Sequence, residues 1–189
     1  FVDALRRDDI LKDNKLLIFT ESTETGEDLY STLSGEYGNK VLFYSSGKCK
    51  QSGENISNAI AKEKILENYD PNNSTESNEI KILITTDVLA EGINLHRSNV
   101  IINYDLPWNP TRVLQRVGRI NRVGTKFDKI YIYNFFPAKE ANDQIKLKEF
   151  VIAKICAFHA TLGEDAKYLC EEEETKNHNL FGEKLYDDL

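Results

Sequence analysis

Short apolar runs alternate with segments of helical periodicity along the first two thirds of the chain. The runs are nearly continuous in Ile, Leu, Val and aromatic residues, which is typical of strands buried on both faces of a parallel sheet. Five such strands are predicted. They cover residues 16–20, 41–45, 80–85, 100–104 and 130–135.

The segments between the runs have the period of amphipathic helices. Residues 25–33 place Leu29, Tyr30 and Leu33 on one face, and residues 56–69 do the same with another apolar group. Residues 70–79 are polar and rich in turn formers, which indicates a surface loop. Alternating strands and helices of this length predict right-handed crossovers and an α/β fold, with a parallel sheet covered by helices on both faces.

Beyond Pro137 the pattern is helical only, with an apolar stripe and a stop at Gly163. Three segments are therefore expected. Residues 1–14 would be the end of a severed helix or a linker, 15–137 the sheet domain, and 138–189 a helical extension with an acidic tail. The 189 residues include no methionine, which favours an excised part of a longer protein.

The net charge of −7 at first argues against a nucleic-acid partner. The charge is unevenly distributed, however, because residues 85–129 hold seven Lys/Arg and four Asp/Glu, while Glu171–Glu174 form an acidic run. A phosphate-binding surface would therefore be local.

The three cysteines are scattered without a C-x-x-C pair, which suggests neither a zinc site nor a disulfide framework. No metal site is expected. A reducing compartment is indicated, and no apolar run approaches the length of a membrane span. We expect a cytoplasmic protein, or a nuclear one in a eukaryote.

The most informative stretch is 109–124, which is predicted to be one helix. Asn109 suits the N-cap, Pro110 suits the first helical position, and Gly124 can end the helix. An apolar stripe and a polar stripe share the same spacing, offset by two residues, or about 200° of rotation. The first holds Val113, Val117 and Ile120; the second holds Gln115, Arg119 and Arg122. One face should pack on the sheet, while the other presents two guanidiniums suited to phosphate.

Gly118 interrupts that helix at a cost of about 1 kcal/mol relative to Ala, which suggests close approach by a ligand or another backbone, or tight helix packing. Other polar residues end the strands, at Thr20-Glu21-Ser22, Thr85-Thr86-Asp87 and Asp105. Because ligands of open α/β sheets bind outside the carboxyl ends of the strands, the chemistry is expected there.

Three motifs in order give a specific resemblance. Residues 16–22 (LLIFTES) are similar to helicase motif IV, residues 84–95 (ITTDVLAEGINL) to motif V, and residues 115–122 (QRVGRINR) to motif VI, QxxGRxxR. The chain resembles the second RecA-like domain of superfamily 2 helicases. Residues 105–110 (DLPWNP) most resemble the Swi/Snf- or RapA-type translocases, although Asn121 replaces their usual His and Thr125 their usual Gln.

The resemblance implies roles for matching positions. Arg119 and Arg122 correspond to arginine fingers that act on the ATP γ-phosphate, and Gln115 links nucleotide state to lobe closure. The motif V residues Glu91, Gly92 and Asn94 would lie at the nucleotide. Residues Thr86, Thr20 and Ser22 would contact the nucleic-acid backbone, although Ser and Thr at strand ends often only cap helices.

The phosphate loop G-x-x-x-x-G-K-[ST] and a D-E-x-D/H motif are missing from the sequence. The resemblance therefore implies that ATP and Mg²⁺ are held mainly by a first RecA-like lobe of the same polypeptide. By itself this chain is expected neither to bind ATP tightly nor to hydrolyse it.

The favoured function is half of an ATP-driven motor on double-stranded DNA, because of the Trp108-Asn109-Pro110 segment. RNA unwinding of the DEAD-box kind is the alternative within the class. A degenerate RecA-like scaffold is a second hypothesis, against which the two arginines argue. A nucleotide-sugar transferase would need a Gly-rich loop and an acidic ribose clamp near the last strands, and the sequence has neither.

Overall fold

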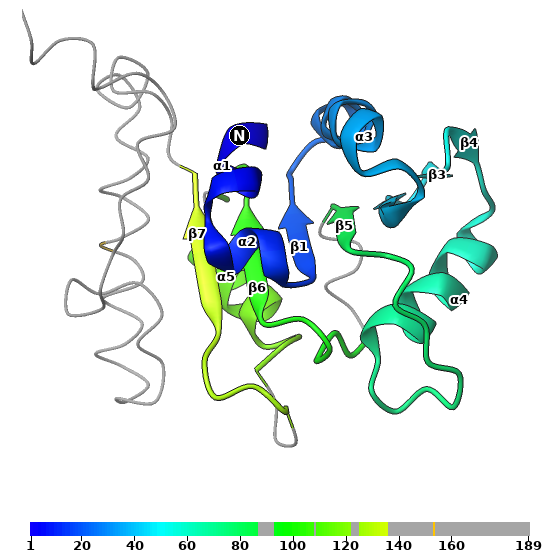
Figure 1. The fold of residues 1–189 in the computed structure, drawn as a ribbon. Coiled ribbons are helices and arrows are strands. Elements are labelled where there is room, and N and C mark those ends of the chain that lie inside the picture. The colour runs from blue at the N-terminus through cyan, green and yellow to red at the C-terminus, as the bar shows by residue number, and fades with distance from the viewer. Residues whose placement is uncertain (87–92, 108, 122–124, 136–152, 154–189) are drawn as a thin grey trace, which may run out of the picture.

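The computed structural model describes residues 1–86, 93–107, 109–121, 125–135 and 153. Within them a seven-stranded sheet has the order β4-β3-β2-β5-β1-β6-β7 (Figure 1). Its strands are β1 (Leu16–Phe19), β2 (Val41–Tyr44), β3 (Cys49–Gln51), β4 (Glu54–Asn55), β5 (Ile82–Thr85), β6 (Val100–Asn103) and β7 (Tyr131–Asn134).

Five of these strands run parallel to one another, namely β2, β5, β1, β6 and β7. They are the five strands predicted from the apolar runs. The antiparallel hairpin β3–β4 beside β2 is not predicted, because strands of three and two residues are too short to show a period. Its turn places Ser52 and Gly53 at φ 54° and 81°, in the left-handed region.

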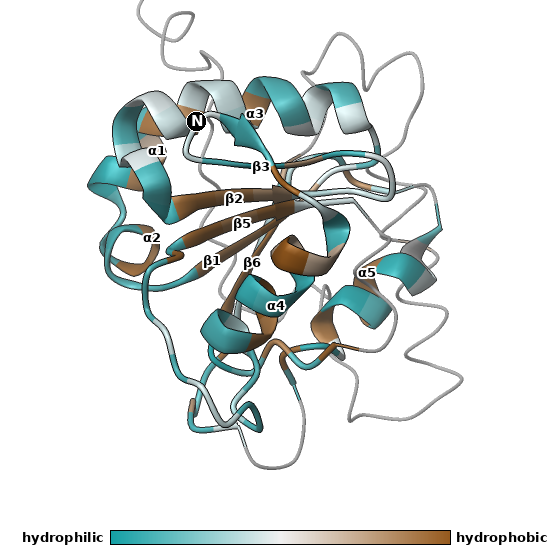
Figure 2. Cartoon of the chain, turned by 90° about the vertical axis from the view of Figure 1, so that its right-hand side faces the viewer, coloured by the Kyte–Doolittle hydropathy of each residue, from teal (hydrophilic) through white to brown (hydrophobic). Residues whose placement is uncertain are grey.

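Helices cover both faces of the sheet (Figure 2). On one face lie α1 (Val2–Arg7), α2 (Asp9–Asp13) and α3 (Thr23–Tyr37); on the other lie α4 (Asn58–Tyr69) and α5 (Pro110–Val117). A short 3-10 helix, η1 (Gly38–Lys40), leads into β2. The predicted α/β fold is confirmed.

Alternation along the strands separates two apolar cores. In β1, Leu16 and Ile18 pack in the core under α1 to α3, while Leu17 and Phe19 pack in the core under α4 and α5. All four side chains are buried. This explains the continuous apolar run, since successive strand residues point to opposite faces and both faces are covered.

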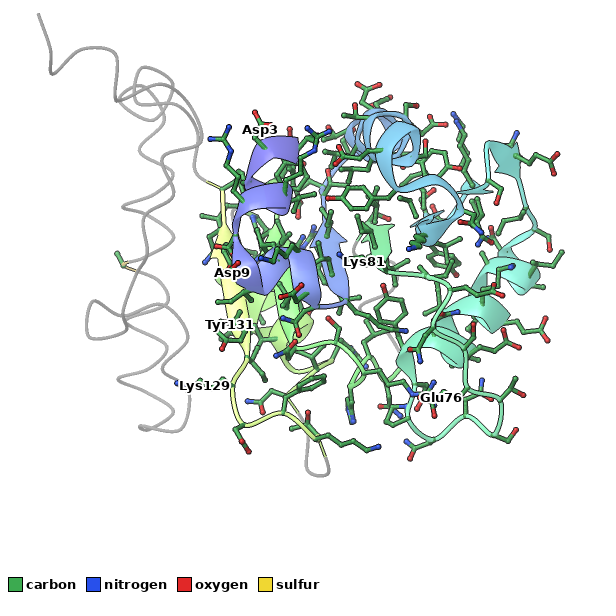
Figure 3. All side chains as sticks on the ribbon, in the orientation of Figure 1. Asp3, Asp9, Glu76, Lys81, Lys129 and Tyr131 are labelled. Carbon is green, nitrogen blue, oxygen red and sulfur yellow. The ribbon has the colours of Figure 1, made fainter. Side chains whose placement is uncertain are left out.

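The N-terminal segment forms two short helices, α1 and α2. The chain bends at Asp8, whose carboxylate accepts the amides of Ile10 and Leu11 at 2.9 and 3.1 Å and so caps α2. Leu5 and Leu11 are buried against the sheet. Asp3 and Asp9 lie on the outer side of these helices (Figure 3).

The helix predicted over 109–124 ends early, because α5 stops at Val117. Gly118 is its C-cap at φ −59° and ψ −11°, and the next two amides bond to carbonyls three residues back, at 3.1 and 3.0 Å. The Arg119 carbonyl instead accepts the amide of Leu95 at 3.1 Å. This tertiary bond takes the place of helical continuation. Gly124 and, apart from residue 153, the segment 138–189 lie outside the described residues.

Candidate functional site

The polar residues that end the strands meet at one edge of the sheet, as expected for parallel strands. Strand β1 lies between β5 and β6, so Thr20 follows the central strand of the three. Its amide donates to the Thr85 carbonyl at 3.0 Å, and the Tyr104 amide donates to the Phe19 carbonyl at 2.9 Å. Backbone bonds thus extend the sheet one residue beyond the strands and fix the motif IV segment.

Thr20 is completely buried at this edge. Its hydroxyl donates to the Asp105 carboxylate, which also accepts the Glu21 amide at 3.3 Å. The direct phosphate contact expected of the Thr20 hydroxyl stays a prediction; in this arrangement that hydroxyl is bonded to Asp105. Thr20 instead fixes Asp105, the second residue after β6, against the end of β1.

Ser22 is the N-cap of α3. Its hydroxyl oxygen accepts the amides of Glu24 and Thr25 at 3.2 and 3.3 Å, and its hydroxyl donates to the Glu24 carboxylate at 2.9 Å. This is the helix-capping alternative that the sequence left open. The side chain stays partly exposed, so capping leaves one side open to solvent.

Thr86, the first residue after β5, is 8% exposed. Its carbonyl accepts the Thr85 hydroxyl at 2.9 Å, which holds the backbone at the start of motif V. Glu91, Gly92 and residues 87–90 lie outside the described residues. Asn94 is described and partly exposed, next to the Leu95 amide that bonds to Arg119.

The two-stripe interpretation of motif VI agrees with the burial of its described residues. Val113, Val117 and Ile120 are 0–1% exposed, whereas Gln115 is exposed and Arg119 is partly exposed. Arg122 lies outside the described residues. The bond between Leu95 and Arg119 brings the end of motif V and the turn of motif VI together.

Gly118 is exposed, and an added Cβ would lie 3.3 and 3.5 Å from the carbonyl oxygens of Leu114 and Gln115. Those atoms belong to the helix that Gly118 ends, so another described backbone does not approach it. Close approach of a ligand to Gly118 stays a prediction.

Sequence reasoning missed Arg116, a fully buried arginine in the last turn of α5. Its guanidinium donates to Asn103 Oδ1 and Glu21 Oε1, each at 2.8 Å, and lies 5.1 Å from the centre of the Phe19 ring. One signal could have found it: residue 116 is three positions after Val113, on the side of the helix that packs.

The Glu21 carboxylate also accepts a hydrogen bond from a second arginine. Arg112, one turn earlier in α5, donates to its other oxygen, Oε2, at 3.0 Å, but its side chain is 49% exposed. The two guanidiniums together hold the carboxylate that follows β1 against the helix. The acidic residue at the motif IV strand end is thereby compensated by positive charge.

Groups of His, Cys, Asp and Glu that could hold a metal ion are not found in the described part of the chain. Among the same residues, no helix is long and apolar enough to cross a membrane.

Comparison with protein families gives a match to "Helicase conserved C-terminal domain" over residues 2–124. The chain belongs to this family. A helicase C-terminal domain of superfamily 2 is what motifs IV, V and VI indicated, and that resemblance is confirmed.

Curated relatives of the domain are ATP-dependent helicases. The chain is 43% identical over 86 residues to the "Uncharacterized ATP-dependent helicase YqhH" of Bacillus subtilis. The aligned region covers 46% of this chain and 15% of that protein. The chain is also 34% identical over 118 residues to "ATP-dependent RNA helicase SUB2" of Scheffersomyces stipitis, or 62% and 24% of the two chains. The domain therefore spans a quarter or less of these relatives.

Two solved structures share the fold. The C-terminal part of the Fun30 ATPase domain matches with a TM-score of 0.55 and 22% identity, covering 74% of this chain and 39% of that one. A Saccharomyces cerevisiae Dbp5 variant bound to RNA and ADP BeF3 matches with a TM-score of 0.54 and 22% identity, covering 79% and 35%. The RecA-like architecture is confirmed.

Proposed function

We propose that this chain is the second motor lobe of an ATP-dependent translocase that acts on double-stranded DNA. The observation that carries the proposal is the placement of Arg119. Its side chain is partly exposed in the turn after α5, while its backbone is held by the Arg116 carbonyl and the Leu95 amide, each at 3.1 Å. A partly exposed guanidinium on a turn held by these two backbone bonds suits an anionic ligand.

The nucleotide side of the proposal combines Arg119 with exposed Gln115 and partly exposed Asn94. Guanidinium and amide donors fit a polyphosphate and its ribose, and Arg122, Glu91 and Gly92 extend the set by family resemblance. ATP with Mg²⁺, when bound, supplies the phosphoryl transfer that drives the cycle. Because the phosphate-loop motif is absent from this sequence, a first RecA-like lobe of the same polypeptide would hold most of the nucleotide.

In this proposal Arg119 and Arg122 place fixed positive charge where negative charge develops in the transition state, and thereby lower the barrier. Gln115 would report the nucleotide state to the lobe interface. These residues would act only when the two lobes close, so turnover would depend on closure.

The nucleic-acid side lies along the ends of β1 and β5. Ser22 and Thr86 are proposed to contact the backbone, and Thr20 would act indirectly by fixing Asp105 and the Glu21 amide. We favour DNA because Trp108-Asn109-Pro110 resembles the Swi/Snf-type segment. RNA is the second candidate, since relatives at 32–34% identity are named as RNA helicases.

The test is ATP hydrolysis by the complete polypeptide, with Arg119→Ala beside wild type. We expect turnover to fall by about 10³-fold, the scale of arginine-finger losses, with ATP binding retained. Arg112→Ala is the matched control, because Arg112 also lies on this segment but bonds Glu21 at the surface. Equal turnover in wild type and Arg119→Ala would instead favour a degenerate scaffold.

Stimulation by duplex DNA and by single-stranded RNA should be measured in the same assay. Greater stimulation by duplex DNA is expected. Greater stimulation by RNA would move the assignment to the DEAD-box kind.

A further inference from the structure

Three lysines lie at the edge of the sheet where its strands begin. Lys40 immediately precedes β2, Lys81 precedes β5 and Lys15 precedes β1. These strands are neighbours in the order β2-β5-β1 and run parallel, so the three lysines meet at one edge. The proposed motor residues Thr20 and Thr86 lie at the opposite ends of β1 and β5.

The register of the sheet places the three lysines side by side. Leu16 pairs with Ile82, which pairs with Val41, so the residues just before them are also in step. Two backbone bonds join these residues: the Leu16 amide donates to the Lys81 carbonyl at 2.8 Å, and the Lys81 amide donates to the Lys40 carbonyl at 2.9 Å. Because neighbouring strands lie about 4.8 Å apart, the three lysines start from a row about 10 Å long.

The three lysines line a pocket of about 220 Å³. The lining also includes the amide side chains of Asn14 and Asn78 and one carboxylate, that of Asp13. Three ammonium groups against one carboxylate leave the lining with an excess of positive charge. A concave surface with this charge concentrates small anions.

Two of the ammonium groups are held in place by backbone carbonyls. Lys15 Nζ donates to the carbonyl oxygens of Asn68 and Ser77 at 2.6 and 3.4 Å. Lys81 Nζ donates to the Lys12 carbonyl and so lies beside α2 (Figure 3). These acceptors carry no net charge, so they orient the ammonium groups without neutralising them.

The positive charge of this pocket is not paired within the described part of the chain. The lysine ion pairs found there all involve other lysines. Burial, together with the like charge of Lys40, lowers the pKa of Lys81, although the Asp13 carboxylate opposes the shift. The charged form of Lys81 is therefore held at a cost, which a bound anion would offset.

We propose that this pocket is a binding site for a small molecule that carries more than one phosphate group. Lysine ammonium groups bind phosphate oxygens as point charges, and the Asn78 amide adds a neutral donor. More than one phosphate group is inferred because the lysines are spread over three strands. The site is separate from the proposed motor edge and does not depend on that assignment.

A nucleic-acid strand fits this edge less well than a small molecule. Proteins that follow a nucleic-acid backbone extend their positive charge along its track. Here the segments that carry or adjoin the pocket also expose carboxylates, from Asp9 and Asp13 in α2 and from Glu76 and Glu79 before β5. These charges would repel the neighbouring phosphates of a strand.

The test uses the complete polypeptide and a readout that resolves single lysines. Inorganic pyrophosphate is the probe, without Mg²⁺, and sodium chloride at equal ionic strength is the reference. An amine-acetylating reagent is applied briefly, and peptide mass spectrometry gives the acetylation rate at each lysine. This resolution is needed because the proposed nucleotide site of the polypeptide also accepts phosphates. Lys62, an exposed lysine of α4 outside the pocket lining, is the internal reference.

We expect pyrophosphate to protect the lysines of the pocket. At a concentration of about ten times its Kd, acetylation of Lys40 and Lys81 should slow by about tenfold, because the bound fraction is shielded. Acetylation of Lys62 should stay within about twofold of its rate in sodium chloride, since ionic strength is matched.

Two substitutions of exposed residues should move the affinity in opposite directions. Lys40→Gln removes one ammonium group and should raise the pyrophosphate concentration for half-protection of Lys81 by about tenfold, the scale of one charge-assisted hydrogen bond. Asp13→Asn removes the repelling carboxylate and should lower that concentration by about threefold. Lys62→Gln is the matched control: it makes the same change of net charge as Lys40→Gln and should leave the concentration unchanged.

Three results would overturn the site. One is the absence of protection at Lys40 and Lys81, and another is equal protection of Lys62, which indicates general screening. The third is weaker binding by Asp13→Asn. If duplex DNA or single-stranded RNA protects Lys40 and Lys81 at lower concentrations than pyrophosphate does, the edge binds nucleic acid and the small-molecule assignment is wrong.

Discussion

Helices α3 and α5 both follow parallel strands and both start at the same edge of the sheet, but they are held in different ways. α3 has fifteen residues and buries Leu29, Tyr30 and Leu33 in an apolar core. α5 has eight residues and buries an arginine beside Val113 and Val117. Apolar packing dominates the described contacts of α3, whereas those of α5 also include hydrogen bonds from the Arg112 and Arg116 guanidiniums.

This difference matters because the two kinds of contact respond differently to displacement. Apolar contacts are non-directional and change little when neighbouring atoms shift slightly. Charge-assisted hydrogen bonds depend on distance and angle, so a small movement of one partner is felt by the other. We infer that α3 belongs to the rigid frame and that α5 is the helix whose position can follow its partners.

The largest expected effect comes from removing the polar attachment of α5. In this chain Arg116→Leu should lower the free energy of unfolding by about 3 kcal/mol, because Asn103 and Glu21 lose their buried donor. Urea unfolding followed by circular dichroism measures it. Arg112→Leu, at the exposed end of the same carboxylate, should cost less than about 1 kcal/mol. Equal losses in both variants would erase the distinction between buried and exposed attachment.

The next effect tests the apolar attachment of α3. A Cβ added at Gly26 would lie 2.5 Å from Cε2 of the buried Phe43 ring, so Gly26→Ala forces helix and strand apart. We expect a loss of about 2 kcal/mol in urea unfolding, after the better helix propensity of Ala is included.

Gly35 supplies the matched control for that substitution. It lies in the same helix, and an added Cβ there meets nothing within 4 Å. Gly35→Ala should therefore stabilise the chain by about 0.5–1 kcal/mol. If Gly35→Ala destabilises the chain, the helix-propensity gain assumed for both substitutions in α3 is wrong, because packing does not change at Gly35.

A smaller effect concerns the start of α3. Ser22→Ala should lower the free energy of unfolding by about 1 kcal/mol through loss of the cap, and Ser22→Asp should retain most of it. Duplex DNA affinity of the complete polypeptide then separates the two roles. If Ser22 also contacts phosphate, Ser22→Asp weakens binding through like-charge repulsion, although the helix is intact. Unchanged affinity in both variants would leave only the capping role.

The smallest effect concerns α4, which packs on the same face of the sheet as α5. Lys15 contacts the last turn of α4. Lys15 donates to the Asn68 carbonyl at 2.6 Å and lies 5.0 Å from the Tyr69 ring centre. Burial, with the nearby Arg97 charge, lowers the pKa of Lys15 to about 8. The folded state thus binds its proton less tightly than the unfolded state, so stability should rise with pH between about 8 and 10.5.

Urea midpoints of wild type and Lys15→Met at pH 7.5 and pH 9.5 test this dependence. The wild-type midpoint should rise more than that of the variant, by a modest amount because solvent screens a partly exposed charge. The comparison cancels the contribution of Lys81, whose pKa burial also lowers. Parallel changes in both proteins would exclude Lys15 as the source.

Much of the fold follows from the sequence because burial on two faces leaves an unbroken apolar run. The central strand, residues 16–19, is found this way, and the helix predicted over residues 25–33 lies within α3, which starts two residues earlier, at Thr23. The end of α5 cannot be predicted in this way, because the hydrogen bond between Leu95 and Arg119 is tertiary and leaves no signal in the local sequence.

For the candidate site, the sequence predicts which edge of the sheet holds the polar residues. It does not predict their contacts. Thr20 is recognisable as a motif IV residue, but its hydroxyl is bonded to Asp105, 85 positions away. The role of Arg116 depends in the same way on Glu21, 95 positions away. The roles assigned to Arg119, Arg122 and Gln115 stay predictions.

The hairpin β3–β4 has a consequence for solubility. Its strand β3 pairs with β2, whose four residues are all buried and apolar or aromatic. Without the hairpin, the edge of β2 would be open to pairing with another chain. β4 is only two residues long, both exposed, and Lys50 of β3 pairs with Glu27 at 2.7 Å. Short, charged edge strands discourage the strand addition that begins aggregation. The hairpin therefore shields this edge of a sheet whose central strands are apolar and would favour aggregation if exposed.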